Sequence, residues 1–246
     1  MLKPRLAGTI IVKNQIVVQS IGFKKYLPIG NVKNSLKNLS EWEVDEIYLI
    51  DIDSTQKKTP NFKLIDEVSK LRINTPLVYG GGINSSEHAR EIIKKGFEKI
   101  IISNLLFQNP SEIIKIFNLI GKESLIINLI FKKFKKNYLF FDTLNNQFHK
   151  IDLDKFFKKF SDYFSEILLM DYNHDGVYDN FDKKIINFNK FGNKNFILMG
   201  GISINSNLKI LLKNKRIRSI AIGNYLNYKE SSIFNIKKHF KNEFRK

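Results

Sequence analysis

The sequence predicts an α/β protein of the (β/α)₈ TIM barrel class, in which eight parallel strands alternate with eight helices. Eight short apolar segments alternate along the chain with segments whose apolar residues recur at helical spacing. A length of 246 residues, 43% of them hydrophobic, suits one barrel domain. The second half of the chain also repeats the pattern of the first half. We therefore expect residues 1–246 to form a single barrel domain built from two half-barrel repeats.

The predicted strands are short runs rich in Ile, Leu and Val. They lie near residues 5–12, 46–51, 76–79, 99–103, 124–130, 166–170, 195–199 and 218–222. Apolar runs of this length, bounded by turn residues, are typical of buried parallel strands. In the first strand, residues 5, 7, 9 and 11 have the same parity and should project from one face, so this face ends in the aliphatic Ile11.

Each predicted strand is followed by a segment with helical periodicity, and several of these segments begin with Ser, Asn or Asp as a potential N-cap. The expected helices are residues 31–42, 61–71, 85–96, 110–121, 152–164, 180–192, 205–214 and 231–244. The alternation of strands with helices predicts repeated βα units and a parallel sheet.

The formal charge of +17 raises the possibility of a polyanionic partner. Lysines are spread over almost every segment, however, so we expect no nucleic-acid site, and the charge should instead help to attract a phosphorylated substrate. The densest basic cluster, residues 131–141, is interpreted as a solvent-facing turn between two strands.

Composition also excludes several kinds of site. The chain has no cysteine, which excludes disulfides, thiolate metal sites and cysteine nucleophiles and suits a reducing compartment. No apolar run approaches the roughly 20 residues of a membrane helix, so we expect a cytoplasmic protein without a membrane segment. The histidines at positions 88, 149, 174 and 239 are too dispersed to indicate a metal site, and we expect neither a metal nor a cofactor.

The internal repeat places polar strand ends in matching positions. Asp51 precedes Gly81 by 30 residues, and Asp171 precedes Gly201 by 30 residues. Asp53 follows the first of these aspartates. Two half-barrels are the simplest explanation for an aspartate and a glycine turn repeated in register.

The glycine turns predict an anion site. Gly80, Gly81 and Gly82, with Ser103 and Asn104, follow the third and fourth predicted strands. Gly200 and Gly201, with Gly223 and Asn224, follow the seventh and eighth. Glycine lets the backbone approach a ligand, and amides at a following helix start favour phosphate, so the repeated pairs predict a ligand with two phosphates.

These residues resemble a known family. The segments "MLKPRL", "VDEIYLIDID", "YGGGI", "EKIIIS", "NPSEI", "SEILLMDYNHDG" and "MGGI" are similar to the cyclase subunit of imidazole glycerol phosphate synthase, a (β/α)₈ protein of histidine biosynthesis that takes ammonia from a partner glutaminase. The resemblance covers nearly the whole chain. It implies that the phosphate groups of the substrate contact Gly82, Ser103, Asn104, Asp175, Gly176, Gly201 and Asn224.

The chain departs from the family at two positions. The resemblance implies a general acid and a general base, both aspartates, in the first and fifth strands, where this sequence has Ile11 and Ile130. Lys13 and Lys132 keep the family spacing, which supports the alignment. Because an aliphatic side chain cannot transfer a proton, we expect ordinary cyclase activity to be severely impaired.

The opposite end of the barrel keeps the family pattern. Arg5, Glu46, Lys99 and Glu166 match four charged residues that, in the family, close the bottom of the barrel and admit ammonia from the glutaminase. Glu46 and Glu166 each lie five residues before an aspartate, so they should mark the N-terminal mouth, with the aspartates just beyond their strands. By resemblance, Glu98 is expected to reach the partner.

Three functions remain open at this point. The first is a divergent ammonia-conducting barrel that works with a glutaminase, and with a separate sugar amidotransferase, in acetamidino modification of a nucleotide-activated surface-polysaccharide sugar; divergent relatives with such a role resemble this chain in "MLKPRL" and in the hydrophobic first strand. The second is a histidine-pathway cyclase with a relocated acid and base. The third is a non-catalytic scaffold or a basic nucleic-acid-binding barrel.

Overall fold

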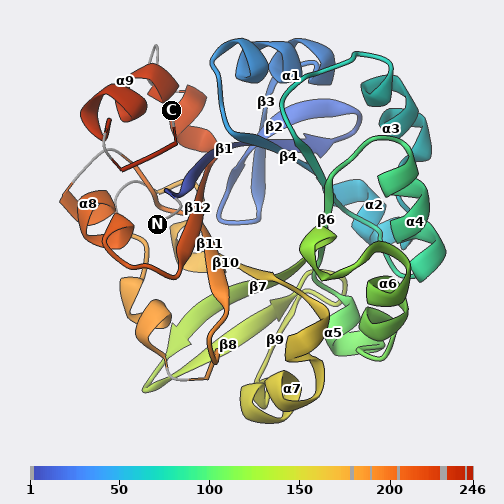
Figure 1. Ribbon diagram of the computed structural model, residues 1–246, viewed down its shortest axis with the longest axis vertical. Coiled ribbons are helices and arrows are strands. Elements are labelled where there is room, and N and C mark those ends of the chain that lie inside the picture. The colour runs from blue at the N-terminus through green and yellow to red at the C-terminus, as the bar shows by residue number, and fades with distance from the viewer. Residues whose placement is uncertain are drawn as a thin grey trace.

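Eight parallel strands close into a barrel at the centre of the molecule, and helices surround it (Figure 1). The computed structural model describes residues 3–177, 180–188, 190–203, 206–227, 232–241 and 243–245. The barrel strands are β1 (Arg5–Lys13), β4 (Glu46–Asp51), β5 (Leu77–Gly80), β6 (Lys99–Ile102), β7 (Leu125–Phe134), β10 (Glu166–Asp171), β11 (Asn195–Met199) and β12 (Ile217–Ile222). Each pairs in parallel with its neighbour, and pairing of β7 with β10 closes the ring. The predicted (β/α)₈ barrel is confirmed.

Seven of the eight predicted helices form the outer layer. They are α1 (Val32–Glu41), α3 (Phe62–Ser69), α4 (Ser86–Lys94), α6 (Glu112–Ile120), α7 (Leu153–Phe160), α8 (Ser206–Leu212) and α9 (Ser232–His239). Two short helices that were not predicted, α2 (Ile52–Lys57) and α5 (Leu105–Gln108), follow β4 and β6. Short 3₁₀ turns complete the connections: η1 (Lys122–Ser124), η2 (Ser161–Tyr163), η3 (Tyr172–His174) and η5 (Asn224–Asn227).

The prediction of a helix over residues 180–192 was wrong. In its described parts, residues 180–188 and 190–192, the segment has one regular element, the 3₁₀ helix η4 (Lys183–Asn187), which is capped at its start by the side chain of Asp182. Phe188 then takes an extended backbone with ψ of 111°. The consecutive residues Ile185 and Ile186 are both buried, and so is Phe191. A tight turn followed by an extended residue buries these side chains where a regular helix would spread them over different faces.

Two hairpins extend the barrel at the C-terminal ends of its strands. β2 (Ile16–Ile21) and β3 (Lys25–Gly30) continue β1 as an antiparallel hairpin, and β8 (Asn137–Asp142) and β9 (Gln147–His149) continue β7. The basic segment 131–141 contains the predicted turn only at its centre, at Lys135 (φ of 54°) and Lys136; the rest of the segment belongs to β7 and β8, and Phe131 and Phe140 are buried. The strands of residues 16–30 were not predicted.

The hydrophobic core has two layers. The larger layer lies between the strands and the helices, and the smaller one fills the barrel interior. Inside the barrel, the fully buried ring of Tyr48 belongs to the same cluster as the small side chains of Ala7 and Ala221. Large and small side chains therefore combine to fill the interior, as dense packing requires.

The two half-barrels share backbone features at their strand ends. Gly81 and Gly82 have φ of 132° and 69°, and Gly200 and Gly201 have φ of 94° and 65°. A Cβ on Gly81 would lie 2.2 Å from the carbonyl oxygen of Asp51, and one on Gly200 would lie 2.8 Å from that of Asp171. Both turns therefore require glycine at these two positions. The structure thus pairs Gly81 with Gly200, whereas the 30-residue spacing in the sequence pairs Gly81 with Gly201. The two pairings differ by one position.

Candidate functional site

A cavity of about 450 Å³ lies at the C-terminal ends of the strands, where enzymes with this fold carry their active sites. Residues of the first half-barrel and of both hairpins supply most of its wall. Its floor is aliphatic, and the residues that form it are Ile11, Ile50, Ile101, Ile130, Leu168, Met170 and Met199. Polar side chains at the end of β1 and in and just after α2, among them Lys13, Gln56 and Lys58, also line the cavity.

Ile11 and Ile130 both belong to this floor. They are 8% and 4% exposed, respectively, and each lines the cavity. In the part of the chain that the structure describes, Asp53 is the single carboxylate among the lining residues, and it accepts a hydrogen bond of 2.5 Å from the amide of Asn14. The floor itself has no group that can donate or accept a proton.

The first of the two predicted anion turns opens into the large cavity. We call Gly81, Gly82, Ser103 and Asn104 the first cradle, and all four line the cavity. The hydroxyl of Ser103 donates to the carbonyl of Asn128 at 3.4 Å, and the side-chain oxygen of Asn104 accepts from Thr143 at 2.9 Å. The structure thus brings these four residues together around open space.

The second predicted turn lines a much smaller space. We call Gly200, Gly201, Gly223 and Asn224 the second cradle; with Asp175 and Gly176 these residues line a cavity of about 40 Å³. Ile11 and Met199 line both cavities and so lie between the two cradles.

Asp175 contacts the β2–β3 hairpin. Its carboxylate accepts hydrogen bonds from the Ser20 hydroxyl at 2.6 Å and the Phe23 amide at 3.0 Å. Burial raises the pKa of Asp175, because the loss of hydration outweighs these hydrogen bonds. Asp175 therefore holds the hairpin against the loop that follows β10.

Asp51 and Asp171 serve as caps at their strand ends. They are the last residues of β4 and β10, so the expectation that they lie beyond their strands was wrong. Asp51 accepts from the amide of Ser54 at 3.1 Å and thereby caps α2. Asp171 accepts from the amide of Asp182 at 2.8 Å and lies 2.8 Å from Nδ1 of His174. Both carboxylates are buried, and neither lines either of the two cavities.

Four aromatic side chains form a cluster over the barrel that sequence reasoning missed. Phe23 stacks on Tyr172 with ring centres 4.8 Å apart, and Phe141 and Phe148 lie 4.9 Å and 4.8 Å from the same ring. Phe23 and Phe141 line the large cavity. The available signal was the high phenylalanine content of the segment from β7 to β9, but the cluster joins it to Phe23 and Tyr172, which are far away in the sequence.

At the opposite end of the barrel, four charged side chains form a closed ring, which we call the charged ring. Arg5 lies 2.8 Å from Glu46 and 2.6 Å from Glu166. Lys99 lies 3.3 Å from Glu46 and 2.7 Å from Glu166. Each charge thus has two opposite charges as neighbours, and the side chains of the two glutamates are only 6% exposed.

Attraction between opposite charges favours the ionised forms of Arg5 and Glu166. Burial alone would raise the pKa of Glu166, but attraction to Arg5 and Lys99 and their hydrogen bonds lower it below its ordinary value. Burial would lower the pKa of Arg5, yet attraction to Glu166 and Glu46 raises it. Toward the interior, the hydroxyl of Tyr48 donates to Glu46 at 3.0 Å, and burial raises the pKa of this tyrosine.

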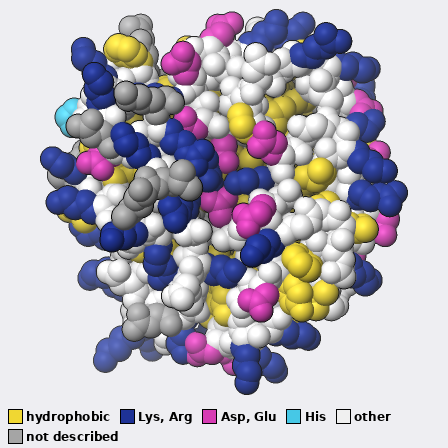
Figure 2. Space-filling model, viewed as in Figure 1, with side chains coloured by type: hydrophobic (Ala, Val, Ile, Leu, Met, Phe, Trp, Pro, Cys, Tyr) yellow, Lys and Arg dark blue, Asp and Glu magenta, His cyan; other side chains and the backbone are white. Residues whose placement is uncertain are grey.

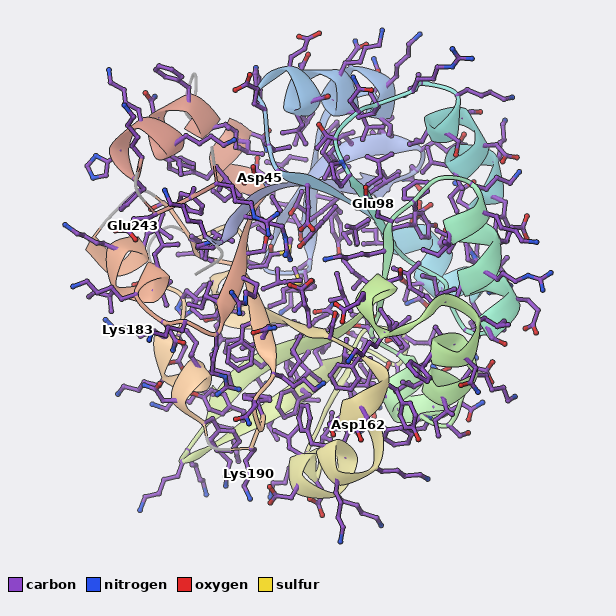
Figure 3. All side chains as sticks on the ribbon, in the orientation of Figure 1. Asp45, Glu98, Asp162, Lys183, Lys190 and Glu243 are labelled. Carbon is purple, nitrogen blue, oxygen red and sulfur yellow. The ribbon has the colours of Figure 1, made fainter. Side chains whose placement is uncertain are left out.

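The surface around the charged ring is the face shown in Figures 2 and 3. Acidic side chains gather near its centre, and Lys and Arg dominate its periphery (Figure 2). Glu98, which precedes Lys99, and Asp45, which precedes Glu46, lie on this face near the barrel mouth (Figure 3). Glu98 is exposed.

The described residues contain neither a candidate metal site nor a membrane-spanning helix. No group of three or more His, Cys, Asp and Glu side chains among them could hold a metal ion. None of the helices formed by these residues is long and apolar enough to cross a membrane.

Comparison with known proteins places this barrel in a family. Residues 5–232 match the model of the histidine biosynthesis protein family. The chain belongs to this family. It is 31% identical over 236 residues to a protein of Leptospira interrogans that is provisionally named imidazole glycerol phosphate synthase subunit HisF, covering 93% of this chain and 92% of the relative.

Other relatives carry similar names. The provisionally named subunit hisF2 of Vibrio vulnificus is 33% identical over 188 residues, which are 76% of this chain and 69% of that protein. Imidazole glycerol phosphate synthase subunit HisF of Pyrococcus furiosus is 34% identical over 128 residues, which are 52% of this chain and 51% of that protein. Membership of the histidine biosynthesis family agrees with the (β/α)₈ barrel of the structure.

Proposed function

We propose that this chain is an ammonia-conducting barrel subunit that works with a glutaminase. Ammonia released by the partner enters at the charged ring, crosses the barrel interior and reaches the cavity at the C-terminal end. The observation that carries the proposal is the presence of Ile11 and Ile130 together in the floor of that cavity, at the opposite end from an intact ring of four charges.

The aliphatic floor argues against the cyclisation for which several relatives are named. General acid and base catalysis typically contributes about 10² to 10⁴-fold to a rate. Ile11 and Ile130 can supply none of it. Ammonia that reaches this cavity is then used by another protein, and we propose acetamidino modification of a nucleotide-activated surface-polysaccharide sugar by a separate amidotransferase as that use.

The barrel interior suits passage of neutral ammonia. Between the charged ring and the cavity floor, the inner core consists largely of apolar side chains such as Val78, Ile126 and Ile197. A neutral molecule enters such an interior at far lower cost than an ammonium ion. The two carboxylates of the ring are each paired with Arg5 and Lys99, so the ring offers no unpaired negative charge to hold an ammonium ion.

The relatives support specialisation within the family. Two of them, provisionally named hisF2 and hisF3, come from the same strain of Vibrio vulnificus, so that strain has more than one protein of this kind. A duplicated copy is free to lose the proton-transfer residues while keeping the entrance.

A second candidate function is the cyclase reaction itself with a relocated acid or base. The observation that favours it is Asp53, whose carboxylate lies at the rim of the large cavity. Growth of a histidine auxotroph that expresses this chain in place of its own cyclase subunit separates the two candidates. We expect no rescue, and rescue would establish the second function.

The decisive experiment for the first function is glutamine hydrolysis by a candidate glutaminase from the same organism, measured with and without this chain. We expect stimulation by the barrel and a stable complex with about 1,200 to 2,000 Å² of buried surface, the usual size of a specific interface. Glu98→Lys should weaken the complex without unfolding the barrel, because Glu98 is an exposed charge on the mouth face. Glu67→Lys, on the exposed side of α3, is the matched control and should leave association unchanged. Absence of stimulation and of co-purification would refute the conduit.

A further inference from the structure

We infer that the C-terminal mouth takes a ligand with one phosphate-like group, held in the first cradle, because the β2–β3 hairpin occupies the second. The ligand binds at the same C-terminal mouth as in the proposed function. Its class follows from the cavity, and only the use made of the ligand rests on the proposed function. This inference replaces the sequence-based expectation of a ligand with two phosphates.

The two cradles differ first in space. The first cradle opens into a cavity of about 450 Å³, which is within the range of volumes of small-molecule binding sites. The second borders about 40 Å³, which is room for a few water molecules. The repeated sequence pattern therefore produces one open site and one filled site.

The hairpin supplies the atoms that fill the second cradle. The side-chain amide of Asn224 donates to the carbonyl oxygen of Ser20 at 2.5 Å. The Ser20 hydroxyl and the Gly22 amide donate to Asp175 at 2.6 Å and 3.0 Å. A Cβ on Gly176 would lie 2.9 Å from the same Ser20 carbonyl. The side-chain amide of Asn224, which would otherwise be available to an anion, thus already has a partner in the hairpin.

Charge separates the cradles further. The lining of the large cavity contains Lys13 and Lys58 against the single carboxylate of Asp53. The lining of the small cavity contains Asp175 and neither lysine nor arginine among the residues that the structure describes. In the repeat, Asp175 lies 120 positions after Thr55, which lines the large cavity. The second half therefore has a carboxylate where the first half has a hydroxyl, and a carboxylate beside an anion is repulsive.

The remaining walls of the large cavity indicate an uncharged body for the ligand. Ile11 and Ile130 form part of its floor, and the rings of Phe23 and Tyr26 line its side. The ammonium group of Lys13 lies 4.6 Å from the centre of the Tyr26 ring. A sugar-sized molecule with a single phosphate matches this combination of apolar floor, aromatic side and basic rim.

Titrations followed by NMR test the inference with three probes: inorganic phosphate, fructose 6-phosphate and fructose 1,6-bisphosphate. We expect phosphate to shift the amide signals of Gly82, Ser103 and Asn104 and to leave those of Gly201 and Gly223 in place. The two sugar phosphates should bind within threefold of each other, because the second phosphate finds no site.

Exchanging the residues that differ between the halves sharpens the test. Thr55→Asp gives the first half-barrel the carboxylate that the second half has at Asp175, and it should weaken phosphate binding at least fivefold. As a control, Asp175→Asn keeps a side-chain acceptor for the Ser20 hydroxyl and the Phe23 amide, which hold the hairpin beside the large cavity, and should leave binding in the first cradle within twofold. If Thr55→Asp does not fold, Lys58→Asn removes a positive charge from the lining at a position whose φ of 53° suits asparagine, and should weaken binding about threefold.

Three results would overturn the inference: bisphosphate binding at least tenfold tighter than monophosphate binding, shifts of equal size in both cradles, or no phosphate binding at all. The titrations contain neither glutaminase nor ammonia. A failed complex with the glutaminase would therefore leave this inference standing, and failed phosphate binding would leave the conduit standing.

Discussion

The two ends of the barrel interior are built from the same strands but have opposite character. On β1, Arg5 belongs to the charged ring and Ile11, six residues further along the same face, belongs to the aliphatic floor. At about 3.3 Å per residue these two side chains are roughly 20 Å apart. On β7 and β10, Ile130 and Glu166 likewise lie at opposite ends. One scaffold can therefore keep a charged entrance unchanged while the chemistry at the other end is lost, because no side chain belongs to both ends.

Giving the apolar end the carboxylates that it lacks should have the largest effect. Ile11→Asp with Ile130→Asp removes two buried aliphatic side chains, each worth about 2 kcal/mol or more, so the free energy of unfolding should fall by about 4 kcal/mol. Urea denaturation measures it, and Ile11→Val with Ile130→Val is the control, with an expected loss of about 0.5–1.5 kcal/mol per site. A loss below about 1 kcal/mol for the aspartate pair would show that the floor is already well hydrated.

Removing one carboxylate from the charged ring should have the second-largest effect on stability. Glu166→Gln leaves Arg5 and Lys99 sharing one carboxylate, and removing one partner of a buried ion pair costs about 3 kcal/mol. The control is Asp66→Asn, which breaks the ion pair with Lys95 on the surface; there the side chains are 37% and 43% exposed, and the loss should stay below about 1 kcal/mol. Equal losses in the two variants would mean that the ring is no stronger than a surface pair.

The two ends should also respond to pH in opposite directions. Folding lowers the pKa of Glu166. Its contribution to stability is therefore fully present at pH values above the pKa of the unfolded state, and it is lost as the pH falls through the pKa of the folded state. Folding raises the pKa of Asp175. Its contribution to stability is therefore fully present at pH values below the pKa of the unfolded state, and it is lost as the pH rises through the pKa of the folded state.

Urea denaturation from pH 3 to pH 7 tests this contrast. The stability advantage of the natural chain over Glu166→Gln should shrink toward the acidic end of the range. The free energy of unfolding of the natural chain, relative to that of Asp175→Asn, should decrease as pH rises. Parallel pH profiles for the two variants would contradict the opposite assignments.

The charged end was easier to predict from sequence than the open end. Glu46, Lys99 and Glu166 each begin a strand, so the closure of eight apolar runs into a barrel brings them to one mouth. This step needs only strand positions and parity, both of which follow from local apolar patterns.

The C-terminal end depends on features without a local signal. The β1–β2 turn uses Asn14 and Gln15, at φ of 49° and 63°, instead of the Asn-Gly or Asp-Gly pairs that indicate a hairpin. Ser20 and Asp175, which hold the hairpin over the second cradle, are 155 positions apart. The sequence repeat indicated two equal anion sites, and the contact between the hairpin and the second cradle is one of the tertiary features that make them differ.

The smallest expected effect lies at the boundary between the two ends, where Tyr48 belongs to the apolar interior but donates its hydroxyl to Glu46 of the charged ring. Tyr48→Phe keeps the ring in place and removes this hydrogen bond, so the free energy of unfolding should fall by about 1.5 kcal/mol, the lower value for a hydrogen bond to a charged group. Tyr138→Phe is the control, because Tyr138 donates to Asp182 at 3.1 Å outside the barrel interior. Glu46 retains Arg5 and Lys99 as partners, so the change should stay well below that of Glu166→Gln. A loss for Tyr48→Phe as large as that for Glu166→Gln would mean that the hydroxyl holds the charged ring together, and that the two ends of the interior are coupled through Tyr48.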